Sequence, residues 1–136
     1  MIIKNALVYT EDHKFEKKDV RIEDERIAEI AENGQITATD EDVIDGEGMY
    51  AIPGLVDIHF HGCKGADMCD GTKEALDVIT AYEASIGVTS VCPATMTIQR
   101  DELLSVMKNA GDYNYHGGAH LVGINMEGPF ISPSKK

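Results

Sequence analysis

The sequence predicts an α/β protein in which a small β region, residues 1–52, precedes the opening of a parallel α/β fold, residues 53–136. In the first region short apolar runs alternate with turn residues, which is typical of short strands. In the second region apolar strand-like runs alternate with amphipathic helical segments, which indicates parallel strands joined by helices. With 43% hydrophobic and 26% charged residues among 136, the composition is that of a folded domain.

Residues 1–52 contain three candidate strands, at 2–9, 20–23 and 26–30. Asp24 and Glu25 form the turn between the last two strands, so a β-hairpin is expected there. Residues 39–48 are acidic and punctuated by glycine, and we expect a loop apart from the apolar pair Val43 and Ile44. The charged residues at 16–19 are expected to face solvent. Nothing in residues 1–52 carries catalytic chemistry.

The elements expected after Pro53 are a strand at 55–61, a helix at 72–86, a strand at 88–92, a helix at 99–110 and a strand at 121–126. In the first helix Leu76, Ile79 and Tyr82 recur at helical spacing, Glu83 faces away from them, and Gly87 serves as the C-terminal cap. Leu103, Leu104 and Met107 form the apolar side of the second helix. Strand, helix, strand, helix, strand with right-handed crossovers opens a parallel α/β fold.

Two histidines stand one residue apart at the end of the first of these strands. On a strand, residues i and i+2 share a face, so His59 and His61 are expected side by side, about 7 Å apart at their backbones. Two imidazoles so placed can bind one zinc ion or a similar divalent metal. The alternative interpretation is two polar residues at a strand end, satisfied by hydrogen bonds.

A carboxylate ends the last apolar run, where Glu127 precedes Gly128 and Pro129. Gly-Pro does not continue a hydrogen-bonded ladder, so Glu127 is also expected at a strand end. A single Glu in this position is otherwise a solvated loop residue. Asn125, two residues earlier, would share the face of Glu127 and is a candidate to hydrogen-bond a metal ligand. The alternative is a satisfied buried amide.

These motifs together resemble the amidohydrolase superfamily, and within it the N-acetylglucosamine-6-phosphate deacetylase family. The resemblance rests on residues 53–62 (PGLVDIHFHG), on residues 87–90 with Pro93 and Thr95, and on the EGPF sequence at 127–130. It covers nearly the whole chain. It implies a metal-dependent (β/α)8 barrel, of which residues 53–136 would supply the first three β/α units, preceded by part of a small β-sandwich domain. In such a barrel the catalytic residues gather at the C-terminal ends of the strands.

The resemblance also implies the chemistry. His59, His61 and Glu127 would bind one or two divalent ions, zinc first among them, and the substrate would be a phosphorylated N-acetyl amino sugar, N-acetylglucosamine 6-phosphate. Hydrolysis of its acetamide yields acetate and glucosamine 6-phosphate. The general base, an aspartate, would lie beyond Lys136, as would two further histidines whose positions His116 and His120 do not match. The 136-residue chain alone is therefore expected to be inactive and to self-associate, and its full-length parent to be a homodimer.

Asn125 is a departure, because many relatives have histidine there. Two other functions stay open: another amidohydrolase, such as an amidase or a deaminase, and a noncatalytic remnant that binds a metal or a protein. Glu127 counts against the first of these, because the common alternative bridges its metals with a modified lysine on a later strand.

Charge and cysteine content exclude several classes of function. A net charge of −12 and a pI near 4.6 argue against binding to nucleic acid or to an anionic membrane. No secretory signal or transmembrane stretch is apparent, and Cys63, Cys69 and Cys92 are an odd number, so we expect reduced thiols and a cytoplasmic location. Cys63 closely follows the two histidines, but a small buried thiol is the favoured interpretation.

Overall fold

The computed structural model describes residues 1–114 and 117–135. The chain divides into two compact units between Pro53 and Gly54, and each unit is described by itself. Within the described residues, no helix combines the length and the apolar character needed to cross a lipid bilayer.

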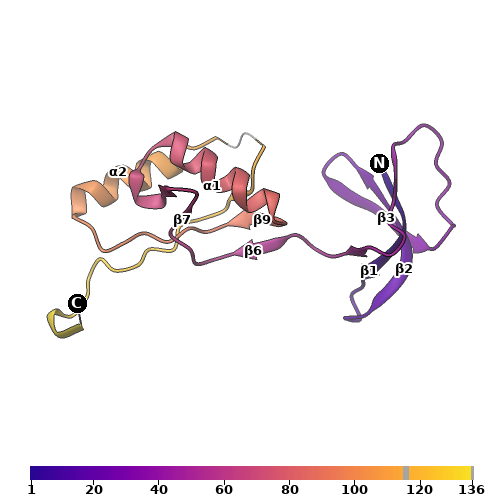
Figure 1. Ribbon diagram of the computed structural model, residues 1–136, viewed down its shortest axis with the longest axis horizontal. Coiled ribbons are helices and arrows are strands. Elements are labelled where there is room, and N and C mark those ends of the chain that lie inside the picture. Colours follow the sequence, from indigo (N-terminus) through magenta and orange to yellow (C-terminus); the bar gives the residue numbers. More distant parts are fainter. Residues whose placement is uncertain (115–116, 136) are drawn as a thin grey trace. The chain divides into compact units, whose positions relative to one another are not determined.

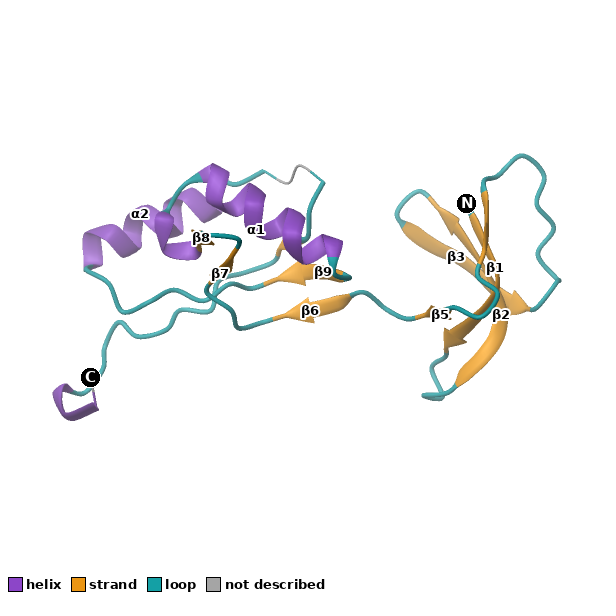
Figure 2. Cartoon of the chain, viewed as in Figure 1, coloured by secondary structure: helices purple, strands orange, loops and turns teal. Residues whose placement is uncertain are grey.

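The first unit is a sheet built around β1 (Ile2–Tyr9). β2 (Phe15–Glu23) and β3 (Arg26–Glu32) continue it as an antiparallel meander (Figures 1 and 2). The expected hairpin joins β2 to β3, and both strands are longer than the apolar runs suggested. β4 (Val43–Asp45) and β5 (Tyr50–Ala51) pair with β1 in parallel. This parallel pairing was not predicted, because strands of two or three residues are too short to show alternation.

A buried carboxylate holds the first sheet together. Asp19 is fully buried and accepts hydrogen bonds from the backbone N–H of Asn5 (3.2 Å) and of Gly34 (2.9 Å). Asn5 has φ +62° and lies where the register between β1 and β2 shifts. The expectation that residues 16–19 are all solvated was therefore wrong for Asp19, because two backbone donors compensate its burial.

The second unit is a parallel sheet covered by two helices. β6 (Leu55–Asp57), β9 (Val88–Val91) and β10 (His120–Leu121) pair in the order β10-β9-β6. α1 (Lys73–Ser85) and α2 (Arg100–Gly111) lie on the same side of this sheet (Figure 2). The smaller elements are β7 (Gly62–Cys63), β8 (Ala66–Asp67) and the 3-10 helices η1 (Met68–Asp70) and η2 (Pro133–Lys135). The predicted alternation of strands and helices is confirmed.

The helices begin and end where their capping residues stand. The Thr72 hydroxyl accepts from the N–H of Ala75 (3.2 Å) at the start of α1, and Gly87, with φ +90°, follows its last turn. Leu76 and Ile79 are buried as expected. In α2 the buried residues are Leu103, Val106 and Ala110, whereas Leu104 is exposed. The prediction that Leu104 belongs to the apolar side of α2 was therefore wrong.

Two of the predicted strands are shorter than their apolar runs. The strands expected at 55–61 and 121–126 end at Asp57 and Leu121. After β6 the Asp57 side chain accepts from the N–H of His59 (3.0 Å), which turns the backbone. His59 and His61 therefore lie beyond the strand, and the i, i+2 argument does not describe how they come together.

Apolar side chains remain exposed around the parallel sheet. They include Leu55, Val56, Ile58, Val122, Met126 and Phe130. Exposed apolar surface of this kind favours association with further protein. The expected self-association stays a prediction.

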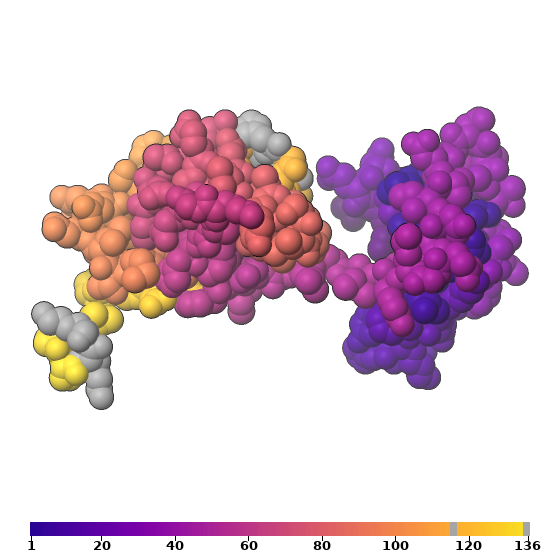
Figure 3. Space-filling model, in the orientation of Figure 1, coloured from indigo at the N-terminus to yellow at the C-terminus, as the bar shows by residue number. Residues whose placement is uncertain are grey.

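Glu83 on α1 is buried rather than solvated. Only 5% of Glu83 is exposed. Its helix, α1, packs against the segment 62–67 in the second unit (Figure 3). Burial raises the pKa of its carboxyl, and the negative charge of Asp57 raises it further. Because the carboxyl binds a proton more readily in the folded state, its contribution to stability is present below the ordinary pKa and is lost as pH rises through the folded value.

We predict that Glu83→Gln stabilises the protein by about 1 kcal/mol at pH 7, and that the gain disappears near pH 4, where the wild-type carboxyl is protonated. Urea denaturation followed by circular dichroism at both pH values measures the difference. Glu74→Gln is the matched control, because Glu74 is exposed in the first turn of α1 and should instead lose about 0.3–1 kcal/mol of helix-dipole stabilisation. A stability change on Glu83→Gln that is the same at both pH values would contradict the raised pKa of the Glu83 carboxyl.

Candidate metal centre

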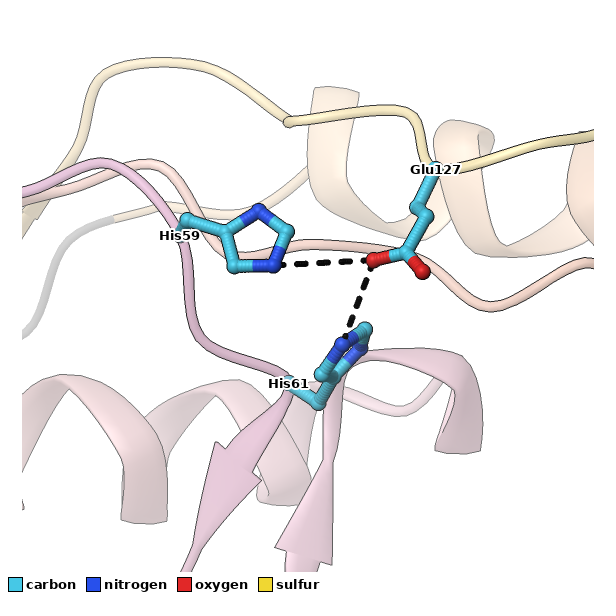
Figure 4. A group of neighbouring side chains, drawn as sticks. All are labelled: His59, His61 and Glu127. Atoms are coloured by element: carbon cyan, nitrogen blue, oxygen red, sulfur yellow. Dashed lines mark ion pairs between the residues drawn. The ribbon is translucent and has the colours of Figure 1, made fainter.

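His59, His61 and Glu127 converge on one point (Figure 4). In the sequence they lie beyond the ends of the parallel strands β6 and β10. The Nε2 atoms of His59 and His61 lie 3.6 Å and 3.4 Å from the same oxygen, Oε2 of Glu127. The two imidazole rings are 5.6 Å apart at their centroids and nearly perpendicular. All three candidate ligand atoms lie within 4.8 Å of one another. The structure thus brings together the three residues singled out in the sequence.

The spacing of these atoms fits a shared cation better than direct hydrogen bonds. Hydrogen bonds from nitrogen to oxygen are commonly about 2.9–3.0 Å long. Two ligand atoms each about 2 Å from a tetrahedral metal are separated by about 3.3 Å, close to both measured distances. Two imidazole nitrogens and one carboxylate oxygen are also a donor set that zinc accepts. The residues present therefore fit a divalent ion.

Backbone hydrogen bonds carry the three segments together beyond their regular strands. The N–H of Ala94 donates to the carbonyl of Phe60 (2.6 Å), and the N–H of Thr95 donates to the carbonyl of Asn125 (3.0 Å). The segment after β9, which contains Ala94 and Thr95, therefore lies between two others. On one side is the histidine segment, which carries His59 and His61, and on the other is the glutamate segment, which carries Asn125 and Glu127. This arrangement extends the order of the sheet past the strand ends.

Thr95 positions Glu127 directly. It is fully buried, and its hydroxyl oxygen accepts a hydrogen bond from the N–H of Glu127 (3.2 Å). In the sequence Thr95 stood out only as one of the residues that carry the family resemblance, because nothing local to it indicates which distant backbone group it contacts.

The turn after His61 requires glycine. A Cβ at Gly62 would collide with the backbone of Ala66 and Asp67 on the paired strand β8. The carbonyl of His61 accepts a hydrogen bond from the N–H of Met68 (2.8 Å). The Nδ1 atom of the His61 ring is buried and has no hydrogen-bond partner among the described residues. The backbone of His61 is thus held on its C-terminal side.

Comparison with known proteins supplies the family context. No family model matches the chain. Over 138 residues the chain is 31% identical to an N-acetylglucosamine-6-phosphate deacetylase from Lysinibacillus sphaericus, a match that covers 99% of this chain and 35% of that protein. A crystal structure of an N-acetylglucosamine-6-phosphate deacetylase from Pasteurella multocida matches with a TM-score of 0.88 at 23% identity, covering 99% of this chain and 36% of that one, which shows the likeness of fold.

The chain is a relative of the N-acetylglucosamine-6-phosphate deacetylases. The resemblance inferred from its motifs is confirmed, and the chain corresponds to the N-terminal portion of these proteins. The chain spans about a third of the length of the curated deacetylases it matches. A dihydroorotase from Bacillus thuringiensis is also similar, with 36% identity over 92 residues that cover 67% of this chain and 20% of the dihydroorotase.

His120 and Cys63 are not part of the three-residue cluster. His120 belongs to β10. His116 lies outside the described residues. Burial, with the charge of Glu83, raises the pKa of the Cys63 thiol.

Asn125 contacts the cluster through His59. Its Nδ2 atom donates to the carbonyl of Ile58 (2.8 Å) and lies 3.1 Å from Nδ1 of His59. Asn125 is thus in direct contact with one candidate ligand, His59.

We predict that Thr95→Val weakens Zn²⁺ binding about tenfold, because the N–H of Glu127 loses its acceptor and the carboxylate loses its fixed position. Isothermal titration calorimetry of the chelator-treated chain measures the affinity, with thermal denaturation as a check on folding. Thr95→Ser keeps the hydroxyl and should retain near wild-type affinity. Equal losses in the valine and serine variants would mean that Thr95 acts only through packing.

Proposed function

We propose that this chain is the N-terminal part of a metal-dependent deacetylase that hydrolyses the acetamide of N-acetylglucosamine 6-phosphate to glucosamine 6-phosphate and acetate. The observation that carries the proposal is the convergence of His59, His61 and Glu127 in a chain related to such deacetylases. The EGPF context of Glu127 supports this substrate class over others in the superfamily.

In this proposal residues 1–52 belong to a small β-sandwich domain and residues 53–136 to a (β/α)8 barrel. β6, β9 and β10 would be the first three barrel strands, with α1 and α2 on the outer surface. The parallel order β10-β9-β6 and the two helices on one side of the sheet support this arrangement. The cluster beyond the strand ends then stands where barrel enzymes carry their active sites.

His59, His61 and Glu127 would hold one or two divalent ions, with zinc the first candidate. A bound ion supplies Lewis acidity that activates water and polarises the amide carbonyl. Within this chain, Glu127 contributes the negative charge that offsets a cation, and the histidines contribute neutral nitrogen donors. Asn125 and Thr95 orient His59 and Glu127 through the hydrogen bonds described above.

The remaining parts of the proposed enzyme would come from residues outside this chain. These are the aspartate general base, two further histidines, the groups that recognise the sugar phosphate, and the homodimer interface of the full-length parent. The open site supports this division, since 54% of the His59 side chain and 48% of the Glu127 side chain are exposed. Enzymatic sites commonly exclude water around the reacting groups.

A second candidate is hydrolysis of a cyclic amide, favoured by the match to dihydroorotase. That match spans 67% of the chain, whereas the match to the deacetylase spans 99%. The two candidates differ in substrate, so one assay that offers both substrates separates them.

We predict that the 136-residue chain binds Zn²⁺ weakly and that the double substitution His59→Ala, His61→Ala raises its dissociation constant about tenfold or more. Affinity should be modest because incomplete coordination does not make a tight site. Calorimetric titration compares the two proteins. His13→Ala is the control, since His13 is an exposed histidine of the first unit that contacts Tyr9. Equal binding by the double variant and the wild type would exclude the two histidines as ligands.

We predict that the full-length parent releases acetate from N-acetylglucosamine 6-phosphate, and that Glu127→Gln lowers kcat/KM about 100-fold or more. The substitution keeps the size of the side chain and removes the charge that offsets the metal, which is worth several kcal/mol. Acetate is measured by a coupled assay, and the 136-residue chain with added Zn²⁺ should stay at background. A parent that instead opens dihydroorotate or another cyclic amide would move the assignment to the second candidate.

A further inference from the structure

The side-chain nitrogen of Asn125 lies between two hydrogen-bond acceptors. Its Nδ2 atom is 2.8 Å from the carbonyl oxygen of Ile58 and 3.1 Å from Nδ1 of His59. An amide NH₂ has two hydrogens, so one nitrogen can serve both neighbours. The contact joins the glutamate segment to the histidine segment through the Asn125 side chain. The orientation of its amide group affects which nitrogen of His59 carries the proton.

The Ile58 carbonyl decides which way the amide of Asn125 points. A backbone carbonyl only accepts hydrogen bonds, so the group facing it at 2.8 Å must be a donor. The reversed amide would place two oxygens opposite one another and leave the carbonyl without this donor. The orientation follows from the chemistry of the neighbours, which is the basis on which amide orientations are assigned.

The same nitrogen then determines the tautomer of His59. Because Asn125 offers an N–H to Nδ1, the neutral imidazole must accept there and carry its own proton on Nε2. We propose that Asn125 holds His59 in the Nε2-protonated tautomer in the metal-free chain. In that form Nε2–H is directed toward Oε2 of Glu127, 3.6 Å away. Asn125 is therefore a positioning residue that acts through His59.

This tautomer opposes metal binding at His59, a consequence that rests on the proposed function. A ligand nitrogen must present its lone pair, so the proton on Nε2 has to move to Nδ1, with no net gain or loss of protons. Nδ1–H then needs an acceptor, and Asn125 can provide one only by turning its Oδ1 inward and giving up the bond to Ile58. Ligating histidines in proteins usually donate from the other nitrogen. Asn125 in its present orientation favours the opposite arrangement.

The two histidines of the cluster thus differ. Nδ1 of His61 is buried and has no hydrogen-bond partner among the described residues, so no contact at Nδ1 selects its tautomer. His61 and Glu127 are therefore the readier ligands, and His59 joins them at the expense of one hydrogen bond. A net hydrogen bond of typical strength corresponds to about a fivefold difference in affinity.

The tautomer is measured directly by long-range 1H–15N correlation spectra of the metal-free chain labelled with 15N-histidine, at about pH 8, where an ordinary imidazole is neutral. The signals of His59 are assigned by their loss in His59→Ala. We expect the Nε2–H pattern for His59 in the wild type, a mixture of tautomers in Asn125→Ala, and the Nδ1–H pattern in Asn125→Asp, whose carboxylate only accepts. The pattern of His61 should not change in either variant, which serves as the internal control.

Calorimetric titration with Zn²⁺ supplies the second measurement, and Asn125→Ala should bind about fivefold more tightly than the wild type. An Nδ1–H pattern for His59 in the wild type, or a tautomer ratio unchanged by Asn125→Ala, would overturn the proposal. Equal or weaker Zn²⁺ binding by Asn125→Ala would overturn its consequence for the metal. Absence of Zn²⁺ binding in the wild type, together with the expected tautomers, would instead count against the proposed metal function and leave the role of Asn125 intact.

Discussion

The site depends on the backbone hydrogen bonds that continue the parallel sheet after its strands have ended. The bond from Ala94 to the carbonyl of Phe60 fixes the histidine segment, and the bond from Thr95 to the carbonyl of Asn125 fixes the glutamate segment. The segment after β9 therefore sets the distance between ligands that are 68 positions apart in the sequence.

Irregular backbone at these positions lets the side chains converge on a point. On a regular strand His59 and His61 would project in the same direction and stay parallel. The Asx-type turn at Asp57 and the tight turn at Gly62 instead bring the two rings nearly perpendicular. Both Nε2 atoms can then approach a single oxygen of Glu127. Parallel sheets commonly place functional groups in such segments beyond the strand ends.

Buried polar groups act differently in the two units. Asp19 is paired with two backbone donors and ties the bulge of β1 to the turn after β3, so its burial is compensated. Glu83 is buried beside another carboxylate, Asp57, and its raised pKa reflects the cost of keeping it ionised. Within the site, the Ile58 carbonyl accepts a hydrogen bond from the Asn125 amide nitrogen, which also faces Nδ1 of His59. This contact favours the tautomer of His59 that carries its proton on Nε2. The hydrogen-bond partners of each polar side chain thus decide whether it stabilises the fold, as Asp19 does, or opposes metal binding, as Asn125 does through His59.

The sequence by itself indicated an α/β fold and the three residues that cluster in the candidate site. Alternating apolar strands and amphipathic helices indicated the parallel α/β unit, and the motifs around His59, His61 and Glu127 indicated the deacetylase relatives, because both signals lie in contiguous stretches of chain. The parallel partners of β1, the burial of Asp19 and Glu83, and the early ends of β6 and β10 were decided only by the tertiary structure. So were the contact of Thr95 with Glu127 and that of Asn125 with His59. Each of these depends on a partner far away in the sequence, and short-range periodicity carries no information about which distant groups the folded chain brings within hydrogen-bonding distance.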